Sequence, residues 1–451
     1  MAGARAEEIA LASAAVPLAD GEAAYTRLLE RIGGTRFVLL GTATHGTQQL
    51  AEERARITRR LLVEKGFDAV AVEGGWPEAH RVQRFIQGVG SDRTPEEALA
   101  SFARFPRWLC QSTVVRDFVA WARRTVPRIG FYGLDLYGMH ASIEAVLRSL
   151  EPLDPDAAAR ARSRYACFER FGPDASTYAL ASAAGAPSCA DAVTQQVLEM
   201  QRRLEAAERS HREGEAVDAS ELETSFQIDM NARLVRHAER YYRSMLGDPV
   251  VAWNLRERHM ADMLASIVQH LNHRLGRLSK IVVWTHLLHA GDARATELGK
   301  ARRISFGQLL RERYDRDAFA IGLTTYEGTV TAATEWGEEP ACIPLFPAVA
   351  GSHERLLHET GERIGAGDFV LLPDENGRLH HALVHERLER AIGVVYRPDA
   401  SERTGWLRAR LADQLDAVVH LDRTTALEPL EPAAPVEQPH GELPQTYPFA
   451  V

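Results

Sequence analysis

The 451-residue chain has 45 % hydrophobic and 25 % charged residues, the composition of an ordinary globular protein that can bury a large core. Its 53 basic and 62 acidic residues give a formal net charge of −9 with no block of like charge, which argues against a nucleic-acid partner. No segment approaches the roughly 18 apolar residues of a membrane span, and Glu7 and Glu8 interrupt the place where a secretory signal would begin. We therefore expect a cytoplasmic protein with neither a nucleic-acid nor a membrane partner.

Short aliphatic or β-branched segments alternate with helical periods along the first part of the chain. The strand-like segments are RFVLLG (36–41), DAVAVEG (68–74) and RIGFYGLD (128–135), and the first helical period is QLAEERARITRRLLVEKG (49–66). Further strands are predicted at 280–286, 318–333, 367–372 and 391–396. This alternation is typical of strand–helix–strand units. It predicts an α/β fold, a mixed sheet with helices on its faces.

The stretch 155–278 differs from the rest because it contains no strand-like segment and is rich in Ala, Glu, Arg, Gln and Leu. We expect a long helical insertion there, which divides the α/β core into a first part, 1–154, and a second part, 279–427. A proline every few residues marks 428–451, and this composition predicts a disordered tail.

The four cysteines, Cys110, Cys167, Cys189 and Cys342, lie far apart and form no CxxC pair. This spacing indicates neither a disulfide framework nor a cysteine zinc site. We expect them to be small buried hydrophobic residues.

Ionisable residues follow four of the predicted strands at the point where each strand ends. The first strand is followed by His45, the second ends on Glu73, the third on Asp135, and the fourth on His286 with His289 three residues later. The carboxyl ends of parallel strands meet at one edge of a sheet, where ligands bind. A lone residue of this kind is more often a loop hydrogen-bonder, but their convergence predicts a cleft with shifted pKa values.

Several motifs are absent, and their absence narrows the chemistry. The sequence has no GxSxG elbow, no GxGxxG after a strand and no GxxxxGK[ST] loop. His353 and His358 are five residues apart, which does not match a zinc-protease helix, and we expect a solvated helix there. What remains is a histidine that removes a proton from water, a carboxylate that orients it and a cation for the oxyanion. Arg54 could supply the cation, although its spacing alone favours a surface arginine.

Longer stretches around these residues resemble the erythromycin esterase family over about residues 36–430. They are THGT (44–47), RARITRRLLVEKGFDAVAVEG with WP (54–77), FARFPRW (102–108), GFYGLDLYG (130–138), RYACFERFG (164–172), AWNLRERHM (252–260), HAGDARAT (289–296) and GVVYRP (393–398). The resemblance implies hydrolysis of macrolide lactones or other esters by activated water, without a serine nucleophile, a required metal or another cofactor.

By this resemblance, His45 is the general base, and Glu73, Arg54 and His286 share the catalytic site with it. We expect substrate contacts from the remaining polar and aromatic candidates, His289, Trp76, Asp135 and Thr42. Trp76, with Trp108, Tyr132 and Tyr137, could wall an apolar cleft, although aromatic residues at such spacing are more often part of a core.

Four positions depart from the family pattern. Thr42 stands where a glutamate precedes the first site histidine, Gln49 replaces a glutamate, Gly75 replaces an aspartate, and Leu287 replaces an asparagine. Three hypotheses therefore stay open. The first is a metal-independent ester or lactone hydrolase with a small-molecule substrate, and the second is a non-catalytic small-molecule-binding homologue. The third is a metal-dependent enzyme whose ligands are His45, Glu73, His286 and His289. Nothing in the sequence indicates the oligomeric state.

Overall fold

The computed structural model describes residues 2–104, 106–172, 174–213, 219–373, 377–398 and 405–430. The chain forms two compact units. The first comprises residues 1–73, 81–131 and 279–451, and the second comprises residues 74–80 and 132–278. None of the described helices is both long and apolar enough to cross a membrane.

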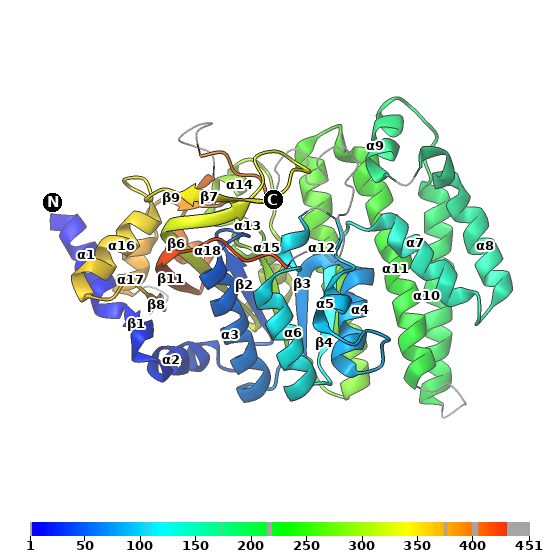
Figure 1. Cartoon of the computed structure of the whole chain (residues 1–451), viewed down its shortest axis with the longest axis horizontal. Helices are drawn as coiled ribbons and strands as arrows, with labels where there is room; N and C mark the ends of the chain where they lie inside the picture. Colours follow the sequence, from blue (N-terminus) through cyan, green and yellow to red (C-terminus); the bar gives the residue numbers. More distant parts are fainter. Residues whose placement is uncertain are drawn as a thin grey trace. The chain divides into compact units, whose positions relative to one another are not determined.

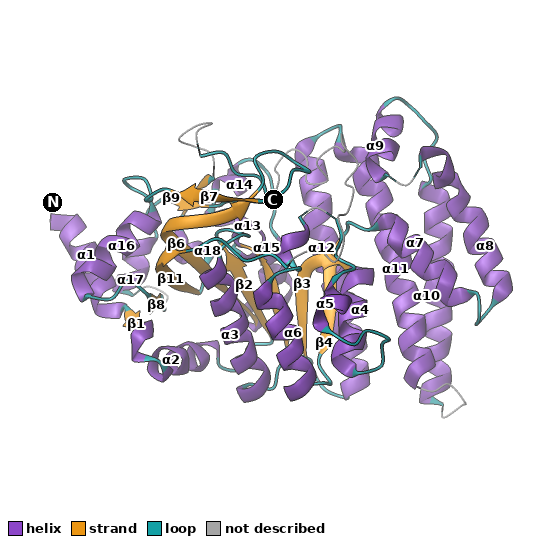
Figure 2. Cartoon of the chain, viewed as in Figure 1, coloured by secondary structure: helices purple, strands orange, loops and turns teal. Residues whose placement is uncertain are grey.

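The first unit is built around a mixed sheet in the order β1-β8-β11-β6-β2-β5-β3-β4, with β7 paired to β6 (Figure 2). Its strands are β1 (Val16–Pro17), β2 (Phe37–Thr42), β3 (Ala69–Gly75), β4 (Gly130–Asp135), β5 (Ile281–His286), β6 (Ala318–Ala332), β7 (Ala341–Leu345), β8 (Phe369–Leu371) and β11 (Ala417–Thr424). The last residues of β3 and β4 belong to the second unit. Strands β3, β5, β2, β6 and β11 run parallel, whereas β1, β7 and β8 make antiparallel pairs. The predicted α/β class with a mixed sheet is confirmed.

The central strands are uninterrupted apolar runs because helices cover both faces of the sheet. Every residue of β2 and β5 is buried. Helices α3 (Gln48–Glu64) and α6 (Thr113–Thr125) contact each other beside β2 (Figure 1). The other helices with residues in this unit are α1 (Ala2–Ala14), α2 (Glu22–Ile32), α4 (Trp76–Gln87), α5 (Pro95–Leu99), α13 (Leu287–Ala290), α14 (Glu297–Lys300), α15 (Phe306–Tyr314), α16 (His353–Ile364), α17 (Arg378–Leu383) and α18 (Leu411–Gln414).

One predicted strand does not form, and several real ones were not predicted. Residues 391–396 make only isolated bridges, from Ile392 to Thr44 and from Val395 to Ala333. Because these two bridges go to different segments, no ladder develops. The strand prediction at 391–396 is therefore wrong. The strands that the sequence patterns missed are β1, β7, β11 and the separate pair β9 (Arg387–Arg390) and β10 (Trp406–Ala409).

The second unit consists mainly of helices. They are α7 (Met139–Leu150), α8 (Pro155–Tyr165), α9 (Ala175–Ala183), α10 (Ala190–Arg212), α11 (Ala219–Met245) and α12 (Pro249–Leu275). Helix α11 packs against α7, α9, α10 and α12. The Asp248 side chain accepts a hydrogen bond from the backbone of Val250 and so caps α12, whose first residue is a proline. This unit begins earlier than the predicted insertion, because it also contains α7.

The cysteines correct an expectation from the sequence. Cys167 and Cys189 form a disulfide with their Cα atoms 5.9 Å apart, because the turn before α10 returns the chain to the 3-10 helix at Ala166–Phe171. Cys110 is half-buried and Cys342 is exposed, so neither is a buried hydrophobic residue. Disulfides are more typical of oxidising compartments than of the cytoplasm. The cytoplasmic location remains a prediction, and the disulfide argues against it.

The end of the chain differs in part from the predicted tail. Residues 428–430 hold backbone contacts, including a bridge from Pro429 to Ser112 and a hydrogen bond from Leu430 N to Gln111 O. The rest of the predicted tail, 431–451, lies outside the described residues.

Helix α16 was expected to be solvated, and its first turn is instead buried. His353 and Glu354 are each 1 % exposed. The Nε2–H of His353 donates to Ala409 O at 3.0 Å, because a carbonyl oxygen only accepts. Glu354 accepts from Thr324 Oγ1 and from Arg390 N. The expectation failed because β9 and β10 cover this turn.

Burial of His353 predicts a loss of stability in acid. Desolvation lowers the pKa of His353 to about 4, whereas an unfolded histidine titrates near ~6.5. Between these values the unfolded chain binds a proton that the folded chain does not bind, so stability is complete above pH ~6.5 and falls as the pH drops. Through His353 alone, the free energy of unfolding should be about 3 kcal/mol lower at pH 4 than above pH ~6.5. Urea unfolding at several pH values should show a weaker acid dependence in His353→Gln, and an unchanged dependence would contradict the argument.

Candidate active site

His45 follows β2 in a loop that other segments hold closely. Ala43 N donates to Leu323 O, and Ile392 N donates to Ala43 O. At Gly46, a Cβ atom would lie 1.8 Å from the carbonyl oxygen of Thr331, so only glycine fits there. The His45 side chain is 2 % exposed, and contacts from β6 and from Ile392 hold the loop that carries it.

Glu73, near the end of β3, joins the histidines. Its Oε2 accepts hydrogen bonds from Thr285 Oγ1 at 2.7 Å and from His286 N at 2.9 Å. Its Oε1 lies 3.9 Å from Nε2 of His45 and 3.5 Å from Nε2 of His289. One carboxylate oxygen is thus anchored to β5, and the other faces two imidazoles. A negative charge so placed favours a protonated imidazole.

His286 is buried between backbone groups. Its Nδ1 accepts a hydrogen bond from Leu288 N at 3.2 Å, and its Nε2 lies 3.1 Å from Ile392 O. Because a carbonyl only accepts, Nε2 carries the proton and the ring is neutral. Burial, reinforced by the nearby His45, holds the pKa of His286 well below its usual range. The rings of His45 and His286 are 4.7 Å apart between centroids.

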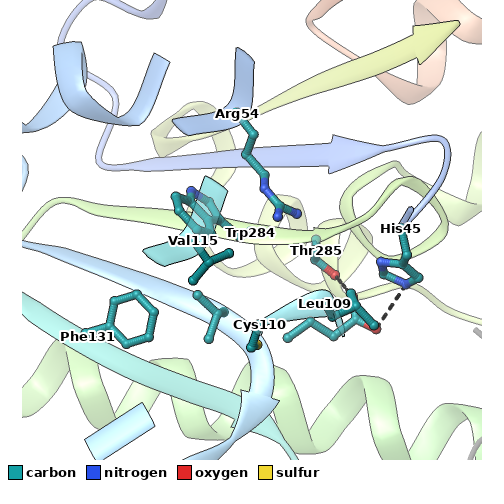
Figure 3. A pocket seen from close by; sticks show the side chains of 10 residues that line it. His45, Arg54, Leu109, Cys110, Val115, Phe131, Trp284 and Thr285 are labelled. Carbon is teal, nitrogen blue, oxygen red and sulfur yellow. Dashed lines mark hydrogen bonds and ion pairs between the residues drawn. The ribbon is translucent and has the colours of Figure 1, made fainter. Parts of the chain in front are cut away.

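Arg54 points from α3 into the same region (Figure 3). The residue is 9 % exposed, and its guanidinium lies 4.8 Å from the ring centroid of Trp284. Burial lowers the pKa of Arg54 to about 10, and the charges of Cys110 and Glu73 oppose this shift. The side chain still carries its charge at neutral pH. It is therefore a buried cation rather than the surface arginine that spacing alone favoured.

These residues line a cavity of about 20 Å³. Its walls are His45, Arg54, Val72, Glu73, Leu109, Cys110, Val115, Phe131, Trp284 and Thr285 (Figure 3). Room for one water molecule requires roughly 10–15 Å³ on this measure, and at least two polar partners. The cavity volume meets the first condition, and the side chains of His45, Glu73, Arg54 and Thr285 among its walls are the polar candidates for the second.

The other predicted site residues have different surroundings. Thr42 is 2 % exposed, and its hydroxyl has no hydrogen-bond partner among the described residues. Trp76 and Asp135 belong to the second unit. There, the Trp76 indole donates to Gln227 Oε1 at 2.9 Å, and Asp135 is paired with Arg256 at 2.7 Å. The expected substrate contacts of these three residues remain predictions.

The remaining departures from the family pattern have structural partners. Gln49 accepts from Thr425 N and donates to Thr425 Oγ1, a combination that a glutamate could not make. At Gly75, a Cβ would lie 2.2 Å from a carboxylate oxygen of Glu78, which occupies that space. Leu287 is 1 % exposed and packs on Gly41, where an added Cβ would lie 3.0 Å from the Leu287 Cα.

Three contributors were missed in the sequence. Thr285 anchors Glu73, and its place before His286 at the end of a strand was an available signal. Cys110 and the carbonyl of Ile392 had no such signal, because segments distant in sequence bring them to the cavity and to His286.

In the described part of the chain, no group of three or more His, Cys, Asp or Glu side chains is arranged to hold a metal ion.

Comparison with known proteins places this arrangement in a family. The family model for erythromycin esterase matches residues 62–424. The chain belongs to the erythromycin esterase family. The match begins after Thr42, His45 and Arg54, so the assignment of these three family positions rests on the shorter sequence motifs around them.

Similar proteins agree with membership of the erythromycin esterase family. The Bacillus subtilis protein YbfO is 20 % identical over 413 residues, which cover 88 % of this chain and 86 % of YbfO. Erythromycin esterase type II of Escherichia coli is 23 % identical over 370 residues, covering 76 % of this chain and 83 % of the esterase. The solved structure of an erythromycin esterase mutant, EreC H289N in its open conformation, shares the fold. Its TM-score is 0.63 at 14 % identity, covering 90 % of this chain and 95 % of EreC. Family membership supports a hydrolase.

Proposed function

We propose that the chain hydrolyses an ester or lactone of a small molecule, with His45 as the general base that activates water. The observation that carries the proposal is the meeting of two imidazoles on Glu73 Oε1, at 3.9 and 3.5 Å, beside the buried charge of Arg54. A cavity with room for one water molecule lies between these groups.

The reaction follows from these positions. Nε2 of His45 removes a proton from a water molecule in the cavity, and the resulting hydroxide attacks the carbonyl carbon of the ester. Glu73 stabilises the imidazolium that forms, and the Arg54 guanidinium stabilises the oxyanion. When the tetrahedral intermediate collapses, the C–O bond to the alcohol breaks and the imidazolium returns its proton to the leaving oxygen. The products are a carboxylic acid and an alcohol.

His286 fits a positioning role better than proton transfer. Both of its ring nitrogens are engaged by backbone groups, and its neutral ring packs beside His45. We therefore propose that His286 fixes the His45 ring and the start of α13. His289, which faces Glu73 directly, is the better second candidate for contact with substrate. The metal-dependent alternative gains no support from the arrangement of the described residues.

A panel of esters and lactones tests the proposal. It should include macrolides, simple lactones and aryl esters of increasing acyl size, assayed with and without a chelator. We expect turnover of at least one class that the chelator leaves unchanged. Absence of turnover across the panel, together with saturable binding of a panel member, would favour the binding-protein alternative. Turnover that the chelator abolishes would favour the metal-dependent one.

Thr42 is the observation that favours the binding-protein alternative, because a neutral, buried residue replaces the family's glutamate. If the missing carboxylate limits catalysis, Thr42→Glu should raise kcat/KM about 10-fold, which requires ~1.4 kcal/mol of transition-state stabilisation. An ionised neighbour would make the His45 imidazole more basic. Thr42→Gln is the matched control, with the same size and no charge. A folded Thr42→Glu protein without any gain would count against the hydrolase, and a thermal melt establishes that it is folded.

A further inference from the structure

The second unit contains a cleft of about 440 Å³ that the proposed hydrolysis does not use. It lies among the first residues of α10, the C-terminal half of α11 and one residue of α12. Its lining residues are Ala190, Thr194, Arg236, His237, Glu239, Arg240, Arg243 and Asp262. Three arginines face two carboxylates here, and the way these charges are paired indicates what the cleft can bind.

Helix α11 carries a stripe of four arginines at helical spacing, and only its two ends are neutralised. Arg233 pairs with Asp229 at 2.6 Å, and Arg243 pairs with Glu239 at 2.8 Å. In the part of the chain that the structure describes, Arg236 and Arg240 have no carboxylate oxygen within 4.0 Å. These two arginines are four residues apart on one face, where like charges repel. Burial, together with the charge of Arg233, lowers the pKa of Arg236.

A pair of histidines holds Arg236 in place without supplying negative charge. Arg236 Nη2 lies 3.2 Å from His237 Nε2, and His237 Nδ1 lies 2.8 Å from His259 Nδ1. Because a guanidinium only donates, His237 Nε2 must accept, and its proton is therefore on Nδ1 and is donated to His259. Burial, with the charge of the other histidine and of the arginines, holds the pKa of His237 well below its usual range. The pair is thus neutral, and the positive charge of Arg236 is not compensated by it.

The start of α10 adds to the positive potential. This 23-residue helix begins at Ala190, which lines the cleft with Thr194 one turn later. The N-terminus of a helix carries a partial positive charge of roughly half an elementary charge. One helix start and two arginines that form no ion pair among the described residues therefore face the same space, and Asp229 and Asp262 offset only part of the Arg236 charge. Asp262, which is exposed on α12, is the opposing charge at this cleft.

We propose that this cleft binds the phosphate group of a small molecule, with Arg236 and Arg240 as its principal ligands. A phosphate dianion between them would relieve their mutual repulsion. Its oxygens would accept hydrogen bonds from the N–H groups of both guanidiniums. The cleft is larger than one phosphate needs, so it also has room for part of an organic group. This proposal does not depend on ester hydrolysis at His45.

Calorimetric titration of the full chain with inorganic phosphate and with glycerol 2-phosphate, at constant ionic strength, tests the proposal. We expect saturable binding that Arg236→Gln/Arg240→Gln weakens by ~10-fold or more. Asp262→Asn should have the opposite effect and tighten binding, because it removes a repulsive charge. Arg202→Gln, at an exposed arginine of α10 outside the cleft, is the control and should bind like the wild type.

The two probes distinguish the source of the phosphate. Tighter binding of glycerol 2-phosphate supports an organic phosphate, and equal binding supports recognition of the phosphate group alone. If the double variant does not fold, Arg240→Gln at an exposed position gives the same test with a smaller expected change. Absence of saturable binding would overturn the proposal, as would equal affinities in the wild type, the double variant and Asp262→Asn.

Discussion

His45→Ala should lose nearly all ester turnover. We expect kcat/KM to fall ~10²–10⁴-fold, which is the rate enhancement that a positioned general base usually contributes. His286 cannot replace it at the same water, because both of its ring nitrogens are engaged by backbone groups, and His289 is not among the residues that line the cavity. The free energy of unfolding should change by only about 1 kcal/mol, since the substitution opens a small, polar space rather than a core cavity. Turnover and urea unfolding on the same preparation separate these two effects.

His381→Ala is the matched control for that variant. His381 is exposed on α17, where its ring lies near that of His380 and its Nδ1 lies 2.8 Å from the Gly377 carbonyl oxygen, away from the cavity-lining residues. It should leave turnover and stability unchanged. If His45→Ala kept the wild-type rate, the assignment of the general base would be wrong even if the protein proved to be an esterase.

Glu73→Gln should lower kcat/KM by ~100-fold. The amide has the same shape and can still accept from Thr285 and His286 N, but it removes the charge that favours a protonated His45. Thr285→Val gives a useful comparison. It removes one hydrogen bond to Glu73 and retains the carboxylate, so we expect a smaller loss of activity, mainly in kcat. Steady-state kinetics of both variants test the argument. A Glu73→Gln enzyme within twofold of the wild type would show that the charge is not used.

The strand ends were the most predictable part of the molecule. Apolar runs that end on a polar residue, such as those before Glu73 and His286, indicate both a buried parallel strand and the edge at which its last side chain lies. Strand β11 lacked this signal because its second part, His420 to Thr424, is polar apart from Leu421, and because the strand follows a segment with helical period. It nevertheless pairs with both β6 and β8 near the middle of the sheet.

Features that depend on tertiary neighbours were less predictable. The burial of Arg54 depends on the Trp284 ring, which belongs to β5. The spacing of residues along α3 does not indicate this contact. The same holds for the disulfide of Cys167 and Cys189, which are 22 residues apart, and for the cover over His353. The pairing of Gln49 with Thr425 likewise joins residues far apart in the sequence. From the sequence alone, the glutamine at position 49 could mean either a lost catalytic group or a residue with a structural partner. The contact with Thr425 shows that it has a structural partner.

The most direct test of the central claim is the pH dependence of kcat/KM for the ester that the wild-type chain hydrolyses fastest. A histidine base must be unprotonated in the free enzyme, so we expect kcat/KM to be constant at high pH and to fall about tenfold per pH unit once the pH drops far enough to protonate that imidazole. The single acid limb should titrate one proton, over a pH range in which a thermal melt shows that the protein remains folded. A rate that is independent of pH between about 5 and 8, or that rises on acidification, would contradict water activation by His45.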